Sequence, residues 1–156
     1  TFSLSLSNAQ ALIDYSRIEN LLQQANICNG TVQHYQEGCI TLWITVGAKK
    51  SGTTTFIGTL YEHTKSITTR GHSYEHHFWE KSLEEVLRDF ENYLSWPARR
   101  IRRKVFAFHE KTPSYLVGLE TFRNLHKVLP PNYQRAVRLL VLLRDPIKRI
   151  HSDMIH

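Results

Sequence analysis

The residues best suited to chemistry lie in a short loop that holds two lysines between two glycines. Lys49 and Lys50 stand between Gly47 and Gly52, and three threonines follow at residues 53–55. The loop comes after an apolar run of strand length, and the threonines can cap and begin a helix. The free backbone N–H groups and the dipole of a helix N-terminus attract anions. The pattern therefore indicates a site for a phosphate or a similar group.

The spacing of this loop differs from the phosphate loop of nucleoside triphosphatases. That motif is GxxxxGK[ST], in which a lysine follows the second glycine and a hydroxyl holds magnesium. Here Gly47 and Gly52 have the required separation, but Thr53 takes the place of the lysine. The glycine separation keeps a P-loop nucleotide kinase or hydrolase as one alternative, although the lysine is missing. An ordinary glycine-containing turn without a ligand is another alternative.

Histidines and carboxylates gather in the polar stretch after this loop, where zinc binding is a rival interpretation. The stretch has neither the HExxH spacing nor a comparable one, and the adjacent His76 and His77 point to opposite sides of an extended chain. We therefore expect no metal. The residues concerned are Glu62, His63, His72, Glu75, His76, His77 and Glu80.

Four motifs resemble, in order, those of sulfotransferases that use 3′-phosphoadenosine 5′-phosphosulfate (PAPS), in particular the heparan sulfate 3-O-sulfotransferases among the carbohydrate sulfotransferases. Residues 50–54 (KSGTT) are similar to the loop that binds the 5′-phosphosulfate. Residues 75–79 (EHHFW) and 110–115 (EKTPSY) are similar to two further signatures of the group. Residues 143–149 (LRDPIKR), with Ser152, resemble the 3′-phosphate motif. The resemblance implies the sulfotransferase fold, which is an α/β fold with a P-loop-like parallel sheet flanked by helices.

The resemblance also implies a role for individual residues. Lys50 would neutralise charge on the oxygen between phosphate and sulfur as that bond breaks. Glu75 would be the general base that activates the acceptor, and His77 would orient or assist it. Lys111 would lie near the transferring group and the acceptor. The expected contacts of the donor are Lys49, Lys50, Ser51, Gly52, Thr53, Thr54, Thr55, Arg144 and Ser152.

The implied function is transfer of a sulfuryl group from PAPS to a hydroxyl or amine, with a carbohydrate or glycan as the expected acceptor and PAP as the product. No nucleic-acid partner is expected. In a eukaryote the expected location is the Golgi lumen, with any membrane anchor outside this chain. Trp79, Glu80 and Met154 depart from the family's pattern. Because family domains continue beyond the position of His156, we expect residues 1–156 to form one sulfotransferase domain that lacks its C-terminal part.

The charge of the chain favours anionic partners. It is +6 at pH 7, with a pI near 9.5, which suits a nucleotide, a polyanionic glycan, nucleic acid or an anionic membrane surface. A non-catalytic module that binds glycan or nucleic acid is thus a further alternative. Its candidate surface is the basic cluster at residues 99–104, although such clusters are usually only solvated. No apolar run has the length of a membrane span.

The two cysteines leave the redox setting open. Cys28 and Cys39 are compatible with a single bridge or with two free, buried thiols. Residues 29–31 read NGT, an N-glycosylation acceptor that matters only in a secretory protein. Together these features favour a lumenal setting without establishing it.

A parallel sheet must position the motifs. The continuous apolar run at residues 40–46 predicts a central strand buried on both faces. Residues 136–143 predict a second fully buried strand, and residues 105–108 predict a third. All the candidate motifs then fall at the carboxyl ends of strands, where parallel α/β sheets bind their ligands.

Helices are expected between these strands. Residues 8–27 carry apolar residues at helical spacing with Asn8 as a cap, and the helix that the threonines open should run to about Thr64. Residues 82–95 begin with a capping box, Ser82 and Glu85, and should end at the Trp-Pro pair.

Two more helices are expected towards the end of the chain. One lies between residues 116 and 129, where two prolines follow it. The other begins at Pro146, with Asp145 as its cap. Arg144 would then stand between a strand end and a helix N-terminus.

Overall fold

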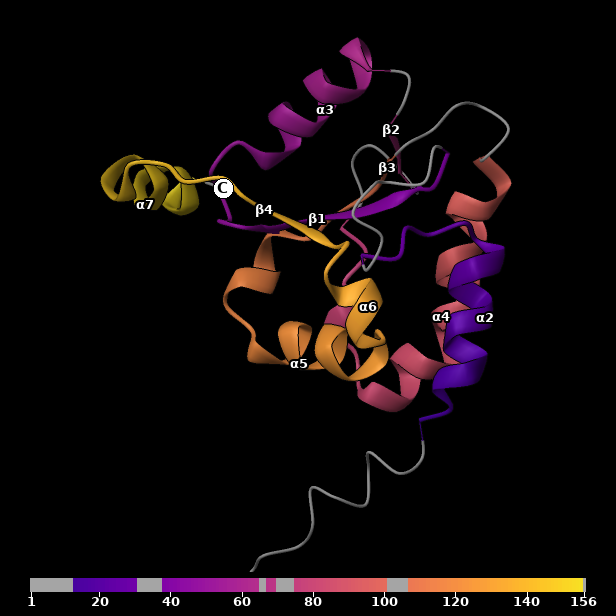
Figure 1. Ribbon diagram of the computed structural model, residues 1–156. Helices are drawn as coiled ribbons and strands as arrows, with labels where there is room; N and C mark the ends of the chain where they lie inside the picture. The colour runs from indigo at the N-terminus through magenta and orange to yellow at the C-terminus, as the bar shows by residue number, and fades with distance from the viewer. Residues whose placement is uncertain (1–12, 31–37, 65–66, 70–74, 101–106, 156) are drawn as a thin grey trace, which may run out of the picture.

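The computed structural model describes residues 13–30, 38–64, 67–69, 75–100 and 107–155. Its centre is a four-stranded sheet in the order β2-β3-β1-β4, in which every strand pair is parallel (Figure 1). The described residues thus form an α/β structure with a parallel sheet flanked by helices, as predicted. The strands are β1 (Thr41–Gly47), β2 (Ile67–Thr69), β3 (Ala107–Lys111) and β4 (Arg138–Val141).

β1 is the buried central strand that the apolar run predicted. It pairs with β3 on one side and with β4 on the other. Leu42, Ile44 and Val46 are each at most 1% exposed and belong to the main hydrophobic core. Thr45, between them in the alternation, is also fully buried. Burial of both faces explains why the run is continuous rather than alternating.

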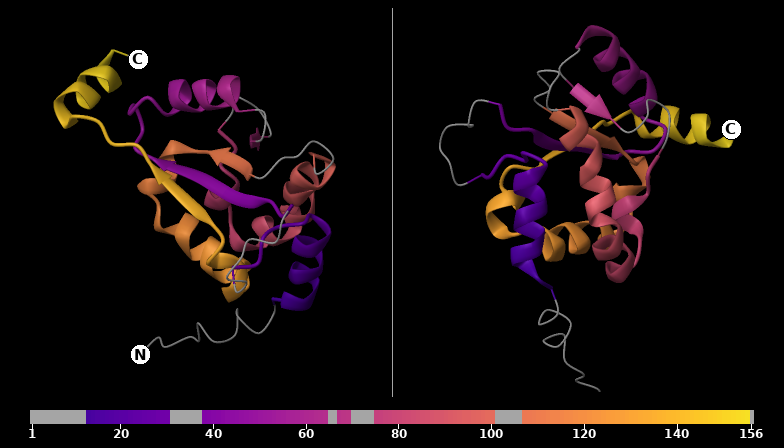
Figure 2. Two further views of the ribbon diagram at one scale, coloured as in Figure 1. Left: turned by 45° about the horizontal axis from the view of Figure 1, so that its top comes forward. Right: turned by 90° about the vertical axis from the view of Figure 1, so that its right-hand side faces the viewer.

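Helices cover both faces of the sheet (Figures 1 and 2). α3 lies on one face, whereas α5 and α6 lie on the other, and α2 and α4 pack side by side. The α-helices are α2 (Tyr15–Gln24), α3 (Thr53–His63), α4 (Leu83–Arg100), α5 (Leu119–Val128), α6 (Pro131–Gln134) and α7 (Pro146–Met154), and two 3₁₀ turns are η1 (Phe78–Glu80) and η3 (Pro113–Leu116). The expected ends of the α3 and α5 regions are confirmed to within a few residues.

The main core fills the space between the sheet and helices α2, α4 and α5. Leu22 and Phe90 are at most 1% exposed within it. Phe78 of η1 stacks on Tyr93 of α4 with ring centroids 4.3 Å apart, and Trp79 is fully buried beside it. Each such side chain contributes roughly 1.5 to 3 kcal/mol of burial free energy. The aromatic contacts therefore fix η1, which follows directly after Glu75 and His77.

Side-chain caps begin three of the described helices, which are α2, α4 and α7. The predicted capping box of α4 is confirmed, since Ser82 N–H donates to Glu85 Oε2 (3.1 Å) and Glu85 N–H donates to Ser82 Oγ (3.3 Å). α2 begins after Asp14, whose side chain accepts from Arg17 N–H. The cap predicted at Asn8 lies outside the described residues.

α4 does not end where its sequence predicted. The helix continues through Pro97 to Arg100. A proline removes one backbone hydrogen bond and crowds the preceding turn, which makes a helix end favourable without making it obligatory. The amphipathic packing of the preceding turns outweighs this cost. The side chains of the basic cluster at residues 99–104 lie outside the described part of the chain.

β3 extends further along the chain than predicted. The strand was expected at residues 105–108, of which residues 105 and 106 lie outside the described residues. The described strand runs from Ala107 to Lys111 and pairs with β1 over that whole length. His109, Glu110 and Lys111 are each at most 4% exposed. A buried strand made of polar residues has no apolar run that would predict it, because the burial of polar side chains depends on partners from other elements.

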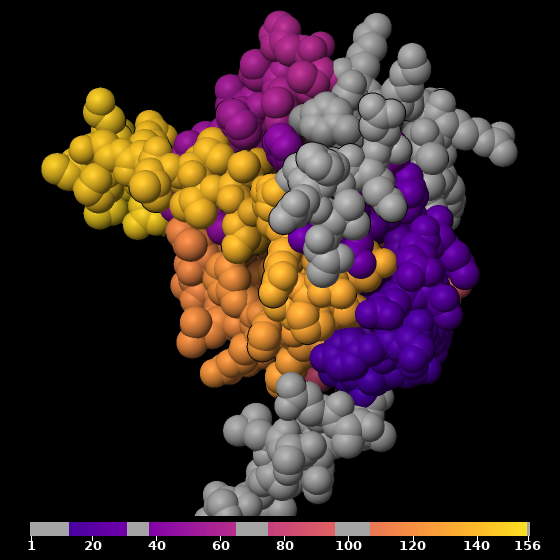
Figure 3. All heavy atoms as spheres, viewed as in Figure 1, coloured from indigo at the N-terminus to yellow at the C-terminus, as the bar shows by residue number. Residues whose placement is uncertain are grey.

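β4 lies at the edge of the described sheet and is partly exposed, so the prediction of a fully buried strand is wrong. Leu139 and Val141 are nearly half exposed, and Leu143 just beyond the strand is 82% exposed. Among the described strands β4 pairs only with β1. The chain then continues into α7, which projects from the rest of the molecule (Figure 3). An apolar run alone does not distinguish an edge strand from a central one.

α7 begins as predicted. Asp145 Oδ1 accepts from Lys148 N–H (2.9 Å), and Pro146 occupies the first helical position. No helix in the described residues is both long and apolar enough to cross a membrane.

Cys28 and Cys39 form a disulfide across eleven residues, which resolves the alternative that the sequence left open. Ile27 and Ile40, next to the two cysteines, form a parallel bridge that holds the entry to β1 beside the end of α2. The sulfur bridge therefore reinforces a connection that the backbone already makes.

Replacing Cys39 with serine is expected to lower the free energy of unfolding by about 2 to 4 kcal/mol, because the unfolded chain gains the freedom of the opened loop. Urea unfolding of the wild type, Cys39→Ser and the double Cys28→Ser/Cys39→Ser variant measures this. The double variant should be no less stable than the single one. Equal stability of wild type and Cys39→Ser would contradict the prediction.

Candidate functional site

The loop after β1 is held in shape by its two glycines. Gly47 has φ +152°, and a Cβ there would lie 2.8 Å from the Cβ of Leu116 and 2.9 Å from the carbonyl oxygen of Pro113. Only glycine allows η3 to approach so closely. Gly52 has φ +84° and is the N-cap of α3. The chain therefore turns sharply from the end of β1 into the helix, as the sequence predicted.

This loop and the start of α3 offer hydrogen-bond donors to an anion. No side chain caps the N-terminus of α3, and Ser51 Oγ is buried without a hydrogen-bond partner in the described part of the chain. A helix N-terminus with uncapped N–H donors and a nearby hydroxyl suits a phosphate or sulfate group. The residues present thus fit the phosphosulfate end of the expected donor.

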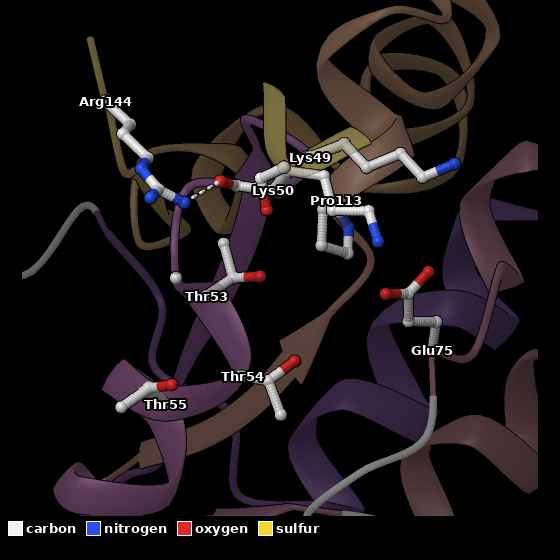
Figure 4. Close-up of a pocket in the computed structure, with 10 residues that line it drawn as sticks. Lys49, Lys50, Thr53, Thr54, Thr55, Glu75, Pro113 and Arg144 are labelled. Carbon is white, nitrogen blue, oxygen red and sulfur yellow. Dashed lines mark hydrogen bonds between the residues drawn. The ribbon is translucent and has the colours of Figure 1, made fainter. Parts of the chain in front are cut away.

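A cavity of about 370 Å³ opens beside the loop. Figure 4 shows Arg144 and Glu75 on opposite sides of it, with the two lysines of the loop between them. All its lining residues except Pro113 were predicted from the sequence. They are Lys49, Lys50, Gly52, Thr53, Thr54, Thr55, Glu75, Pro113, Arg144 and Ser152.

The cationic side of the cavity joins two distant parts of the chain. Arg144 Nη1 donates to the backbone oxygen of Lys50 (3.2 Å), which ties the segment after β4 to the loop after β1. Ser152 reaches the cavity from α7. Ser51 does not line the cavity. The other predicted donor contacts are therefore brought together around one space.

Glu75 lies beside a buried lysine and a histidine. Lys111 Nζ is 4.0 Å from Glu75 Oε1 and donates to Thr54 Oγ1 at 2.9 Å. His77 Nε2 is 3.6 Å from Glu75 Oε2. Lys111 and His77 do not line the cavity, but both contact Glu75, which does. The four predicted catalytic residues, which also include Lys50, thus surround the same region.

Glu80 belongs to this group, although no role was predicted for it from the sequence. Its Oε2 lies 2.6 Å from His77 Nδ1, and its Oε1 accepts from Ser114 Oγ at 2.5 Å. The carboxylate therefore fixes the ring of His77 from the side opposite Glu75. The three-residue separation of His77 and Glu80 was the available signal, but only the 3₁₀ turn makes that separation a contact.

A buried polar cluster joins the sheet to α3. His109 Nε2 lies 2.8 Å from Thr45 Oγ1, and its Nδ1 lies 3.0 Å from the hydroxyl of Tyr61 on α3. Burial, and then the nearby charge of Lys111, lower the pKa of His109 to about 4. The ring is neutral at pH 7, so it joins the sheet to α3 by hydrogen bonds. No sequence pattern marked His109.

Glu110 is buried on the opposite face of β3, away from the cavity. Its carboxyl accepts hydrogen bonds from the hydroxyls of Tyr93 (2.8 Å) and Tyr115. Burial raises the pKa of Glu110 to about 7 despite these bonds. The motif at residues 110–115 thus serves two regions, since Lys111 faces α3 and Glu110 faces the core.

The described residues contain no cluster of three or more histidine, cysteine, aspartate or glutamate side chains suited to a metal ion. His72 of the polar stretch lies outside them. The site instead combines side-chain cations, helix N–H groups and one carboxylate.

No protein-family model, curated protein or solved structure significantly matches the chain. The function is therefore inferred from the site itself.

The raised pKa of Glu110 predicts a specific pH dependence of stability. A carboxyl whose pKa rises on folding stabilises the fold at low pH, and this stabilisation is lost as the pH rises towards the folded-state pKa. Relative to Glu110→Gln, the wild type should lose about 2 to 3 kcal/mol of unfolding free energy between about pH 5 and about pH 8. Urea unfolding of both proteins at both pH values measures it.

The other titrating groups, including His109, are common to the two proteins, so the comparison isolates Glu110. If the difference in unfolding free energy between them stayed constant from the lower pH to the higher, Glu110 would not titrate as described.

Proposed function

We propose that this chain is a PAPS-dependent sulfotransferase with the sulfotransferase fold, which transfers a sulfuryl group to a carbohydrate or glycan acceptor. One observation carries the proposal. Lys50, Glu75 and Arg144, which come from three separated motifs, line one cavity. The cavity has cations and helix N–H groups on one side and a carboxylate beside a buried lysine on the other, which is the arrangement that such a transfer needs.

The cationic side is suited to the donor. The N–H groups and hydroxyls around Thr53 and Thr54 would hold the 5′-phosphate at the N-terminus of α3. Arg144 and Ser152 would hold the 3′-phosphate, because a guanidinium offers a fork of donors to phosphate oxygens. Lys50 would neutralise the bridging oxygen as it leaves.

The other side is suited to acceptor activation. Bound PAPS supplies an activated sulfuryl group. Glu75 would take the proton of the acceptor hydroxyl while the new oxygen–sulfur bond forms, and the bond between sulfur and the phosphate oxygen breaks to release PAP. Lys111, 4.0 Å from Glu75, would hold that carboxylate and stabilise the developing negative charge. His77 would orient Glu75 through its contact at 3.6 Å.

The disulfide supports an oxidising compartment for this reaction. In a eukaryotic cell this would be the lumen of the secretory pathway, and the Golgi is the compartment we propose. Thr53, in place of a phosphate-loop lysine, favours a PAPS-type donor over a triphosphate.

Calorimetry tests the choice of donor. PAP should bind the wild type without magnesium and more tightly than ATP with magnesium. Lys50→Ala should weaken PAP binding by roughly 10-fold, as expected for loss of one charged contact. Lys127→Ala, the same change on α5 at the opposite face of the sheet, should bind PAP like the wild type. Preference for ATP with magnesium would contradict the proposal and favour a kinase or hydrolase.

Enzyme assays test the role of Glu75. Glu75→Gln should lower kcat for sulfation about 100- to 10,000-fold, because it removes the base. PAP affinity should stay within about twofold of the wild type, since the change lies on the acceptor side. Glu84→Gln, which alters an exposed carboxylate in the first turn of α4, is the matched control. Sulfation by Glu75→Gln at the wild-type rate would remove Glu75 from the mechanism.

A further inference from the structure

The backbone that carries Glu75 and His77 is held by buried side chains of the motif at residues 110–115. This motif supplies Lys111 to the site, but Lys111 is only one of its residues. Thr112 and Tyr115 are each fully buried, and neither lines the cavity. Their hydroxyls bond to backbone groups immediately after Glu75, and these bonds point to a role that the proposed mechanism does not yet include.

Thr112 bonds two consecutive backbone groups. Its Oγ1 accepts from the N–H of His76 and from the N–H of His77, each at 3.2 Å. His77 has φ +50°, a left-handed conformation that is costly for a residue with a side chain. The hydroxyl of Thr112 therefore stabilises the segment where its backbone is least favourable.

Tyr115 holds the next part of the segment. Its hydroxyl accepts from Trp79 N–H at 3.1 Å and donates to Glu110 Oε1. Glu110 in turn accepts from Tyr93 of α4. The hydroxyl of Tyr115 thus both donates and accepts a hydrogen bond. Through Glu110 it links η1 to β3 and α4.

The end of β3 aligns these bonds with the site. Thr112 N–H donates to Thr45 O at 3.1 Å, which extends the pairing with β1 one residue beyond β3. Lys111 points towards α3 and contacts Thr54 and Glu75. Because the same stretch of backbone carries Lys111 and holds His76 and His77, it sets the distance between the lysine and the carboxylate.

We propose that Thr112 and Tyr115 are positioning residues that hold Glu75 and His77 in register with Lys111. The inference rests on the proposed function, because positioning has a catalytic effect only if Glu75 is the base. A displacement of about 1 Å can cost a rate on the order of 100-fold. Loss of either hydroxyl should therefore lower the rate of transfer more than it lowers donor affinity.

Amide hydrogen exchange measured by NMR tests, independently of activity, whether Thr112 holds the backbone at His76 and His77. Thr112→Val removes the hydroxyl and preserves the shape of the side chain, whereas Thr112→Ser retains the acceptor. The exchange rates of the His76 and His77 amides should rise roughly 10-fold or more in Thr112→Val and stay near the wild-type rates in Thr112→Ser.

Thr121→Val is the matched control. Thr121 is also fully buried, but its hydroxyl has no hydrogen-bond partner in the described part of the chain. The same substitution there should leave the exchange of the His76 and His77 amides unchanged. Tyr115→Phe should raise the exchange rate of the Trp79 amide in the same way as Thr112→Val raises that of His76.

Kinetics then test positioning. kcat should fall roughly 10-fold or more in Thr112→Val and recover in Thr112→Ser. In both variants the KM for PAPS should stay within about twofold of the wild-type value. Equal exchange rates at residues 76 and 77 in Thr112→Val and Thr112→Ser would contradict the claim that Thr112 holds this backbone. Faster exchange in Thr112→Val with an unchanged kcat would contradict its role in positioning Glu75. Absence of sulfation by the wild type would overturn the proposed function instead, while the exchange rates would still decide the hold.

Discussion

The candidate site depends on the pairing of β1 between β3 and β4. The three strands run in the same direction, and their registers align Thr45 with Lys111 and Gly47 with Val141. Their carboxyl ends therefore lie at one edge of the sheet, as parallel pairing requires. The loop after β1, the lysine at the end of β3 and Arg144 after β4 meet at this edge although the chain separates them widely. If the pairing moved by one residue, Lys111 would point to the opposite face.

The alternation of β3 divides its polar residues between two tasks. His109 and Lys111 face α3, where His109 contacts Tyr61 and Lys111 contacts Thr54. Lys111 also lies beside Glu75. Glu110 faces the core, where two tyrosines hold its carboxyl. Four successive residues from His109 to Thr112 are at most 4% exposed, and each has a hydrogen-bond partner from another part of the chain. A polar strand of this kind is stable because every buried group is paired.

The sequence predicted the parts of the fold and site that depend on local chemistry. The glycines of the loop, the capping box of α4 and the cap at Asp145 act within a few residues, so their patterns are readable. Most residues that line the cavity were predicted from the four motifs, whose segments the parallel sheet brings together. Features that depend on distant partners were not predicted. These are the exposure of β4, the continuation of α4 through Pro97, and the burial of Glu110 between Tyr93 and Tyr115. Glu80 was missed because its contact with His77 requires a 3₁₀ turn.

In the proposed function, the loop after β1 and the segment after β4 would hold the two ends of one donor molecule. NMR titration of the ¹⁵N-labelled protein with PAP measures this most directly. The backbone amide signals of Ser51, Gly52 and Thr53 should shift together with those of Arg144 and Ser152, and all five should follow a single binding curve. Shifts confined to one group of amides, or two curves with different midpoints, would contradict it.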